Sequence, residues 1–333
     1  MSVTIKDIAK LANVSHTTVS RALNDSPHIK AETKRKIVDL AEQLNYIPDY
    51  NARSLVMQKS YTVGVFFTSI TTGTSSSFFS DVIRGVNSVI SENYNLFVRG
   101  IDNYKDYHSI NKKRFDGIIL MSQSDVDNAF IYHVLQSGIP FVVLNRQVQD
   151  TSMINIVPND KAGAYEAVSY LISQGHKQIA MIEGIEGFKS TQERKDGYLK
   201  ALIEHRIPLV QEYILQGSYD MESGYQAMEK LLGLVSRPTA VFCSNDDMAI
   251  GAMRAAFDHG IHIPRELSLV GFDDIGFAHY TTPALTTVKR PIEQISMMGA
   301  KKILELIDEP KQPGDVVFVD TELKIRDSVR SMA

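Results

Sequence analysis

Residues suited to reading DNA bases lie close together near the N-terminus. His16, Thr17, Ser20 and Arg21 fall within six residues. The apolar residues between them recur at the spacing of one helical face, so the polar side chains should point outward. An arginine can donate two hydrogen bonds to guanine, and a hydroxyl can reach a base edge or a phosphate. With Ser15 as its N-terminal cap, this stretch predicts a short helix that lies in a DNA groove.

The preceding residues predict a second helix that positions the first. Thr4 and Asp7 have the spacing of a capping box, and the apolar residues from 5 to 12 form one stripe. Asn13 stands where a tight turn needs a left-handed residue. A third amphipathic helix, residues 32–44, closes the small core, although Lys30 is a weak cap for its start. The three segments predict a helix-turn-helix head, residues 1–47. An ordinary three-helix bundle with solvated charges is the alternative.

A wider set of motifs continues beyond these helices. The motifs are Val3-Thr4-Ile5-Lys6-Asp7-Ile8-Ala9, Val14-Ser15, Thr18-Val19-Ser20-Arg21, Leu44-Asn45-Tyr46-Ile47-Pro48 and Asn51-Ala52-Arg53-Ser54-Leu55. With them, the chain resembles the lactose-repressor (LacI/GalR) family of bacterial transcription regulators over its whole length. The resemblance implies a homodimer that binds double-stranded operator DNA and responds to a small effector. The sequence as a whole also looks similar to the family's regulators of hexuronate use.

The next segment, residues 48–60, is predicted to be a hinge helix and linker. Pro48 ends the third helix, and the residues after it are too few for a helix that is stable alone in water. The resemblance implies that Leu55 wedges between base pairs in the minor groove and Ala52 contacts the dimer mate. An apolar side chain on a basic, marginal helix suits such a wedge. A flexible linker remains the alternative.

The charge distribution agrees with a DNA-binding end. Residues 1–60 hold nine lysines and arginines against six acidic residues, whereas the whole chain carries a net charge of −4. The basic surplus therefore lies in the head, where it can attract phosphates. The predicted DNA-binding residues are Thr4, Ser15, His16, Thr17, Ser20, Arg21, Asn24, Tyr46, Asn51, Ala52, Arg53 and Leu55.

From residue 61 onward, apolar strands alternate with helical stretches, which predicts parallel sheets covered by helices on both faces. There are too many units for one sheet, so residues 61–333 should form two doubly wound lobes. They resemble a periplasmic sugar-binding protein, which implies lobe one at about 61–160 and 291–320 and lobe two at about 161–290 and 321–333. Expected strands are 62–67, 95–100, 116–121, 140–144, 154–157, 178–183, 213–215, 240–244 and 267–272; expected helices are 78–92, 126–137, 161–174, 191–205, 221–232, 246–259 and 291–307.

Polar side chains follow many of these strands, where ligands of such folds bind. Asparagine, aspartate and arginine offer donors and acceptors for sugar hydroxyls, and Tyr219 can stack on a sugar ring. Each Asn or Asp is an equally good helix cap, and both roles can coexist. The residues that match the family's effector contacts are Ser69, Asp160, Arg194, Tyr219, Asn245 and Asp273, with Lys189 added by an alignment uncertain by one residue; Arg146 joins them as a basic strand-end residue.

The effector predicted from these residues is a sugar, and the basic residues favour a uronate or a sugar phosphate. Lys189, Arg194, Arg146 and Arg99 could leave the cleft positively charged. The residues leave open whether the ligand releases DNA or promotes binding, and whether a partner protein acts as corepressor. A sugar-binding module without DNA function and an enzyme on the same fold are the two other classes considered.

Enzymatic, metal-binding and membrane roles are not expected. The sequence has no nucleophile elbow, no phosphate-cradling glycine run and no histidine pair at zinc spacing, and histidines such as His176 should have surface or capping roles. The acidic pairs are adjacent in sequence, so they need not be paired in space. The single cysteine, Cys243, is expected in a buried strand. With a polar N-terminus and no apolar run of eighteen residues, we expect a cytoplasmic protein without cofactor.

Overall fold

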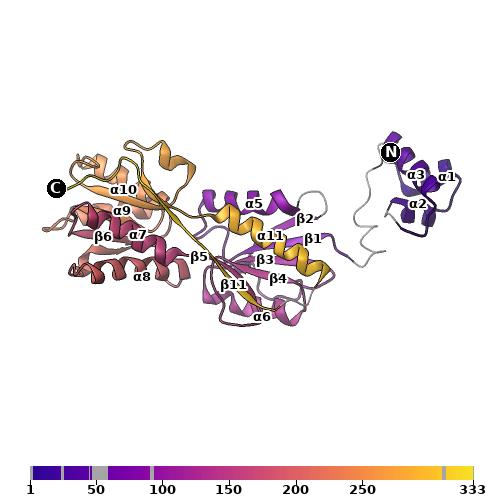
Figure 1. Cartoon of the computed structure of the whole chain (residues 1–333), viewed down its shortest axis with the longest axis horizontal. Coiled ribbons are helices and arrows are strands. Elements are labelled where there is room, and N and C mark those ends of the chain that lie inside the picture. The colour runs from indigo at the N-terminus through magenta and orange to yellow at the C-terminus, as the bar shows by residue number, and fades with distance from the viewer. Residues whose placement is uncertain are drawn as a thin grey trace. The chain divides into compact units, whose positions relative to one another are not determined.

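The computed structural model of the protein describes residues 3–23, 26–44, 46, 59–90, 94–309 and 313–332 (Figure 1). The chain divides into two compact units, Met1–Lys59 and Ser60–Ala333. We call the first the head and the second the body.

The head contains three helices, α1 (Ile5–Ala12), α2 (His16–Leu23) and α3 (Ala31–Gln43). Both predicted caps of the first two helices are present. The Thr4 backbone N–H and hydroxyl donate to Asp7 Oδ2 at 2.8 and 2.6 Å, and Ser15 Oγ accepts from the Thr18 N–H at 3.1 Å. Asn13 takes the left-handed conformation with φ 55°. Helix α3 begins without a side-chain cap, as the sequence predicted.

The first lobe of the body is built on a parallel six-stranded sheet in the order β11-β5-β4-β3-β1-β2. Helices α5 and α11 share one apolar core with the sheet, and α6 packs in a second core with the opposite face (Figure 1). The strands are β1 (Thr62–Phe67), β2 (Asn95–Gly100), β3 (Gly117–Met121), β4 (Phe141–Leu144), β5 (Ile154–Pro158) and β11 (Asp315–Val319); the helices are α5 (Ser76–Ile90), α6 (Asn128–Gln136) and α11 (Ile292–Asp308).

The second lobe repeats this architecture with the strand order β12-β10-β9-β8-β6-β7, and only β12 runs antiparallel to its neighbour. Helices α9 and α10 cover one face, and α7 and α8 cover the other. The strands are β6 (Ile179–Glu183), β7 (Ile214–Gln216), β8 (Ala240–Cys243), β9 (Ser268–Asp273), β10 (Thr286–Lys289) and β12 (Glu322–Lys324); the helices are α7 (Asp160–Ser173), α8 (Lys189–Glu204), α9 (Met221–Leu232) and α10 (Asp246–Asp258).

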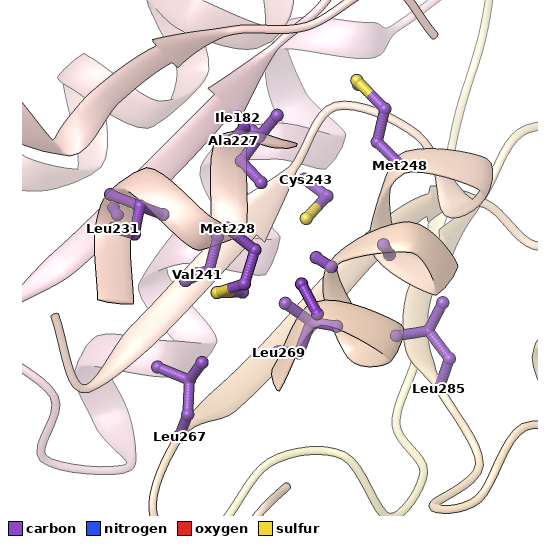
Figure 2. Close-up of a cluster of buried hydrophobic side chains, with 14 of the residues drawn as sticks. Ile182, Ala227, Met228, Leu231, Val241, Cys243, Met248, Leu267, Leu269 and Leu285 are labelled. Carbon is purple, nitrogen blue, oxygen red and sulfur yellow. The ribbon is translucent and has the colours of Figure 1, made fainter. Parts of the chain in front are cut away.

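The core beneath α9 and α10 contains the single cysteine (Figure 2). Cys243 lies at the end of β8, fully buried among side chains that include Met228 and Met248. Burial raises the pKa of its thiol above the ordinary value, so the residue behaves as a small apolar side chain. The two helices approach so closely that a Cβ at Gly251 would stand 1.8 Å from the Met221 carbonyl oxygen.

The predicted fold is confirmed, with one class of error. Three strands, β10, β11 and β12, were not expected from the sequence. β10 and β12 are short and each has a single apolar residue, so they lack the apolar run that marks a buried strand. β11 does contain such a run, Val316 to Val319, which the sequence-based prediction overlooked. The surface role predicted for His176 is also wrong. Its ring is fully buried and contacts Thr239 Oγ1 at 2.9 Å and the Arg330 carbonyl at 3.2 Å.

Candidate DNA interface and effector pocket

Helix α2 presents a polar face to solvent. His16, Thr17 and Arg21 are exposed, whereas Val19 and Ala22 on the opposite side are buried in the core of the head. This separation follows from helical spacing and leaves the three polar side chains available to a DNA groove.

The other predicted DNA contacts in the head have structural partners of their own. The hydroxyls of Thr4 and Ser15 take part in the two helix caps. Tyr46 is half-buried against the head core, and its N–H donates to the Ala41 carbonyl at 2.9 Å. Ser20 is half-buried on α2. The predicted contacts Asn24, Asn51, Ala52, Arg53 and Leu55 lie outside the described residues.

In the body, a small pocket of about 20 Å³ forms where the two lobes meet, so the lobes would have to part to admit a sugar. Four of the predicted effector residues line it: Arg194, Tyr219, Asn245 and Asp273. They come from the second lobe. Arg194 lies in the second turn of α8, Tyr219 and Asn245 follow β7 and β8, and Asp273 is the last residue of β9, as expected for strand ends of a doubly wound fold. The remaining lining residues are Gly73, Ser75, Phe78 and Gln123 from the first lobe, Ser190 from α8, and Arg290 between β10 and α11.

Asp160 is the centre of a buried ion cluster beside this pocket. Its Oδ2 accepts from Nε and Nη2 of Arg194 at 3.2 and 3.0 Å, and its Oδ1 accepts from Nε of Arg290 at 3.0 Å. All three side chains are nearly inaccessible to solvent. Buried charges are costly unless they are paired, so this one carboxylate holds both guanidinium groups in place.

The guanidinium group of Arg194 has further contacts besides Asp160. Its Nη1 donates to the Ser244 carbonyl, and its Nη2 lies 3.5 Å from Asp273 Oδ1. Its guanidinium also lies over the Phe272 ring, 4.0 Å from the ring centre, which favours a cation. The position of the guanidinium is therefore determined before any ligand arrives.

Tyr219 and Asn245 support each other at the pocket wall. Tyr219 has a left-handed backbone, φ 64°, and its hydroxyl lies 3.1 Å from Ser190 Oγ and 2.8 Å from Thr191 Oγ1. The Asn245 side chain donates to the Tyr219 carbonyl at 3.0 Å and accepts from the Met248 N–H at 2.9 Å. Asn245 thus caps α10 and also lines the pocket, so its role as a cap does not exclude a contact with the effector.

Asp273 combines an unusual backbone with a shifted titration. Its φ is 113°, in the region that favours glycine. Burial raises the pKa of its carboxyl to about 6, although Arg194 and Arg290 oppose the shift. The group can therefore change its charge near neutral pH.

Two predicted residues, Ser69 and Arg146, have their side chains engaged elsewhere. Ser69 Oγ accepts from the N–H groups of Thr71 and Thr72, so it shapes the turn after β1. Arg146 donates to Ser122, Asp125 and Asn128 within the first lobe. Within the described residues, neither Ser69 nor Arg146 lines the pocket between the lobes.

Lys189 lies at the first turn of α8 with a half-exposed side chain, 3.3 Å from Glu193. Its backbone N–H donates to the Gln123 carbonyl at 2.8 Å and so joins the lobes. The next residue, Ser190, lines the pocket instead, which matches the one-residue uncertainty of the alignment. Arg99, also counted as a basic cleft residue, lies over the Tyr104 ring.

Sequence reasoning missed Arg290 and the first-lobe residues Phe78 and Gln123. Arg290 follows β10, one of the strands that the sequence did not indicate, so nothing marked it as a strand-end residue. Phe78 was counted as an ordinary helix residue, and Gln123 follows β3 among other small polar residues. A strand assigned to residues 286–289 would have pointed to Arg290.

The described residues contain no cluster of three or more acidic, histidine or cysteine side chains suited to a metal ion. Among these same parts of the chain, no helix has the length and apolar character needed to cross a membrane.

This combination of a helix-turn-helix head and a two-lobed body with a pocket between the lobes defines a class of protein. The chain belongs to the lacI family of bacterial regulatory proteins. The family's sequence profile matches residues 4–49, and the profile of the periplasmic binding protein-like domain matches residues 168–329. Members of this family bind operator DNA and respond to sugar effectors, and this chain is a DNA-binding transcriptional regulator of that kind.

Individual relatives support the assignment over the full length. The chain is 64% identical to the Probable HTH-type transcriptional repressor ExuR of Bacillus subtilis (strain 168), with 99% of both chains covered. It is 35% identical to the HTH-type transcriptional repressor PurR of Photorhabdus laumondii, covering 98% of this chain and 96% of the relative. Catabolite control protein A of Priestia megaterium is 33% identical, covering 99% of this chain and 100% of the relative.

Solved structures agree with this architecture. The lac repressor dimer bound to operator and the anti-inducer ONPF superposes with a TM-score of 0.85 at 26% identity, covering 99% of this chain and 100% of that chain. A LacI family regulator from Enterococcus faecium with bound ribose superposes with a TM-score of 0.74 at 26% identity, covering 82% of this chain and 100% of that one.

Proposed function

We propose that this regulator is a homodimeric repressor whose operator affinity is controlled by a small acidic sugar, a uronate or a sugar phosphate, bound between the lobes. The observation that carries the proposal is the buried cluster in which Asp160 holds Arg194 and Arg290 beside a pocket lined by both lobes. Preorganised guanidinium groups bind carboxylates and phosphates well, and the neighbouring amide and hydroxyl groups suit sugar hydroxyls.

The head would read the operator from both halves of a dimer. His16, Thr17 and Arg21 are exposed on α2 and would contact bases in the major groove, while Leu55 would wedge into the minor groove at the centre of the site. A single head offers too few contacts for a specific site, so two copies on a pseudo-palindrome are needed. The protein would act in the cytoplasm, where the chromosome lies.

Ligand binding in the pocket would affect DNA binding by changing the arrangement of the two lobes. Its residues come from both lobes, and the backbone contact between Lys189 and Gln123 joins their rims. A ligand that binds one lobe arrangement better than another shifts the population between them. The changed spacing of the first lobes in the dimer would decide whether the heads and hinge segments can engage one operator.

An enzymatic role is not proposed, because the charged groups of the pocket already serve one another as partners. Arg194 donates through all three of its nitrogens, and the hydroxyl of Tyr219 lies within hydrogen-bond distance of Ser190 and Thr191. Such an arrangement positions a ligand and offers no paired nucleophile and base.

The proposal is tested by isothermal titration of the full-length protein with neutral hexoses, uronates and sugar phosphates, followed by operator binding with each ligand that binds. We expect an acidic sugar to bind and to change operator affinity. Weakened operator binding identifies an inducer, and strengthened binding identifies a corepressor. If no ligand of the panel changes operator affinity, control by an acidic sugar is wrong, and a partner protein becomes the candidate coregulator.

A further inference from the structure

Arg290 occupies a special place in the body. It lies between β10 of the second lobe and α11 of the first, at one of the points where the chain crosses between lobes. Its Nε donates to Asp160 and its Nη2 donates to the side-chain oxygen of Asn145, which follows β4 of the first lobe. Its guanidinium also lies 5.8 Å from the centre of the Phe78 ring. The side chain is 5% exposed and lines the pocket.

Arg194 and Arg290 differ in how many of their guanidinium nitrogens already donate hydrogen bonds within the protein. All three nitrogens of Arg194 have acceptors within the protein. In the part of the chain that the structure describes, hydrogen bonds to Asp160 and Asn145 engage Nε and Nη2 of Arg290. A guanidinium carries five N–H groups, so Arg290 retains donors for a ligand.

At a pH below about 6, the charges of the cluster also favour an anionic ligand. Two buried guanidinium groups share the carboxylate of Asp160. The second carboxylate, Asp273, has a pKa raised to about 6 by burial, which reduces its negative charge as the pH falls toward that value. A buried cation needs a hydrogen-bonded counter-charge, and a ligand carboxylate would supply one.

We propose that Arg290 binds the acidic group of the effector and sets the preference for an acid over the matching neutral sugar. This inference rests on the proposed function, because it assigns one residue of the same pocket to the recognition of charge. Arg290 donates a hydrogen bond to Asn145 and lies just before α11. The acidic group of the ligand would therefore bind at a point where the chain crosses between the lobes.

The test compares pairs of sugars that differ by one carboxylate. Full-length protein is titrated calorimetrically with D-galacturonate and D-galactose, and with D-glucuronate and D-glucose. The wild type should bind at least one acid more tightly than its neutral partner. Arg290→Gln should reduce that preference roughly 10- to 100-fold, as expected for the loss of a charge-assisted hydrogen bond, because it should weaken binding of the acid more than binding of the neutral sugar.

Two further variants separate recognition from folding. Arg254→Gln is the matched control, because Arg254 is an exposed arginine of α10 that pairs with Asp258 and does not line this pocket; it should keep the acid preference. Arg290→Lys keeps the charge and loses the planar fork, so it should retain part of the preference. Its result decides the question if Arg290→Gln does not fold, as judged by thermal unfolding.

The outcomes distinguish this inference from the proposed function. If an acid binds and controls the operator but Arg290→Gln keeps the full preference, Arg290 is not the residue that recognises the charge and the proposed function stands. If only Arg290→Lys folds and it keeps the preference as fully as Arg254→Gln does, the guanidinium fork of Arg290 does not recognise the acid, and the proposed function stands as well. If the wild type binds neutral sugars as tightly as acids, this inference fails, and so does the acidic part of the proposal. If none of these four sugars binds and none of the sugar phosphates in the wider panel does, both are contradicted.

Discussion

The head and the body both use arginines for recognition, but they hold them in opposite ways. Arg21 is exposed on a short helix, and its place follows from the spacing of residues within that helix. Arg194 and Arg290 are buried, and Arg290 is positioned by partners 130 and 145 residues away in the sequence. An exposed side chain can be changed at little cost to folding, whereas a buried charge that loses its partner destabilises the protein. Recognition and stability should therefore separate in the head and be linked in the body.

The largest expected effect comes from removing the shared carboxylate of the body. Asp160→Ala leaves Arg290 without its acidic partner and Arg194 with Asp273 alone. We expect the free energy of unfolding of the body to fall by about 3–5 kcal/mol, measured by urea denaturation followed by circular dichroism.

Asp125→Ala is the matched control for that variant. Asp125 also pairs with a buried arginine, Arg146, but its own side chain is 90% exposed and Arg146 keeps its bonds to Ser122 and Asn128. Its loss should cost less than about 1 kcal/mol. Equal losses for the two variants would contradict the distinction between a shared buried carboxylate and a peripheral one.

A smaller but selective effect is expected from the core of the head. Ile37 on α3 is fully buried, and it belongs to the small apolar core of the head. Ile37→Ala should cost about 2–5 kcal/mol, enough to unfold so small a unit, and operator binding should be lost while calorimetric affinity for the effector is kept. Simultaneous loss of effector binding would show that the two units do not fold independently.

Arg21→Ala tests recognition without a change in stability. The side chain is exposed, so the thermal midpoint should stay within about one degree while operator affinity falls by about 1–3 kcal/mol, the value of one good base contact. If Arg21→Ala changes the dependence of operator affinity on salt concentration but does not reduce discrimination between operator and other sequences, Arg21 contacts a phosphate and not a base.

The smallest effect concerns pH. Burial raises the pKa of Asp273 to about 6, against the opposing charges of Arg194 and Arg290 and with the support of Asp160 and Asp247. A ligand carboxylate would raise that pKa further, so binding takes up a proton and affinity should fall as pH rises above 6, by at most about tenfold per pH unit. Calorimetry from pH 5.5 to 8 measures the slope. Asp273→Asn should abolish it, and an unchanged slope in this variant would place the titrating group elsewhere.

The same contrast explains what could be predicted from the sequence. Helix α9 was expected at the residues where it is found, and both caps of the head were assigned to the correct side chains, because helical periodicity and capping are local. Strand ends were located well enough to place Tyr219, Asn245 and Asp273 together, since parallel strands bring their carboxyl ends to one edge.

The sequence could not predict which acidic residue each buried arginine pairs with. Arg146 and Arg290 each follow a strand and carry the same charge, yet Arg146 turns to Asp125 and Arg290 turns to Asp160. The difference depends on which distant carboxylate tertiary packing brings near, and no local pattern encodes it. The sequence also could not decide between two adjacent residues. Lys189 was predicted to contact the effector, but its side chain lies near Glu193, and Ser190 lines the pocket.

The most direct test of this account measures operator affinity with and without effector in the wild type and in Arg194→Lys. A labelled duplex selected by the protein from random sequences is titrated in fluorescence anisotropy at fixed salt. We predict that a bound acidic sugar shifts the wild-type curve, and that Arg194→Lys binds the free operator normally but shows a much smaller shift, because lysine cannot replace the fork held by Asp160 and Ser244. A full shift in the variant would contradict control of the operator through this pocket.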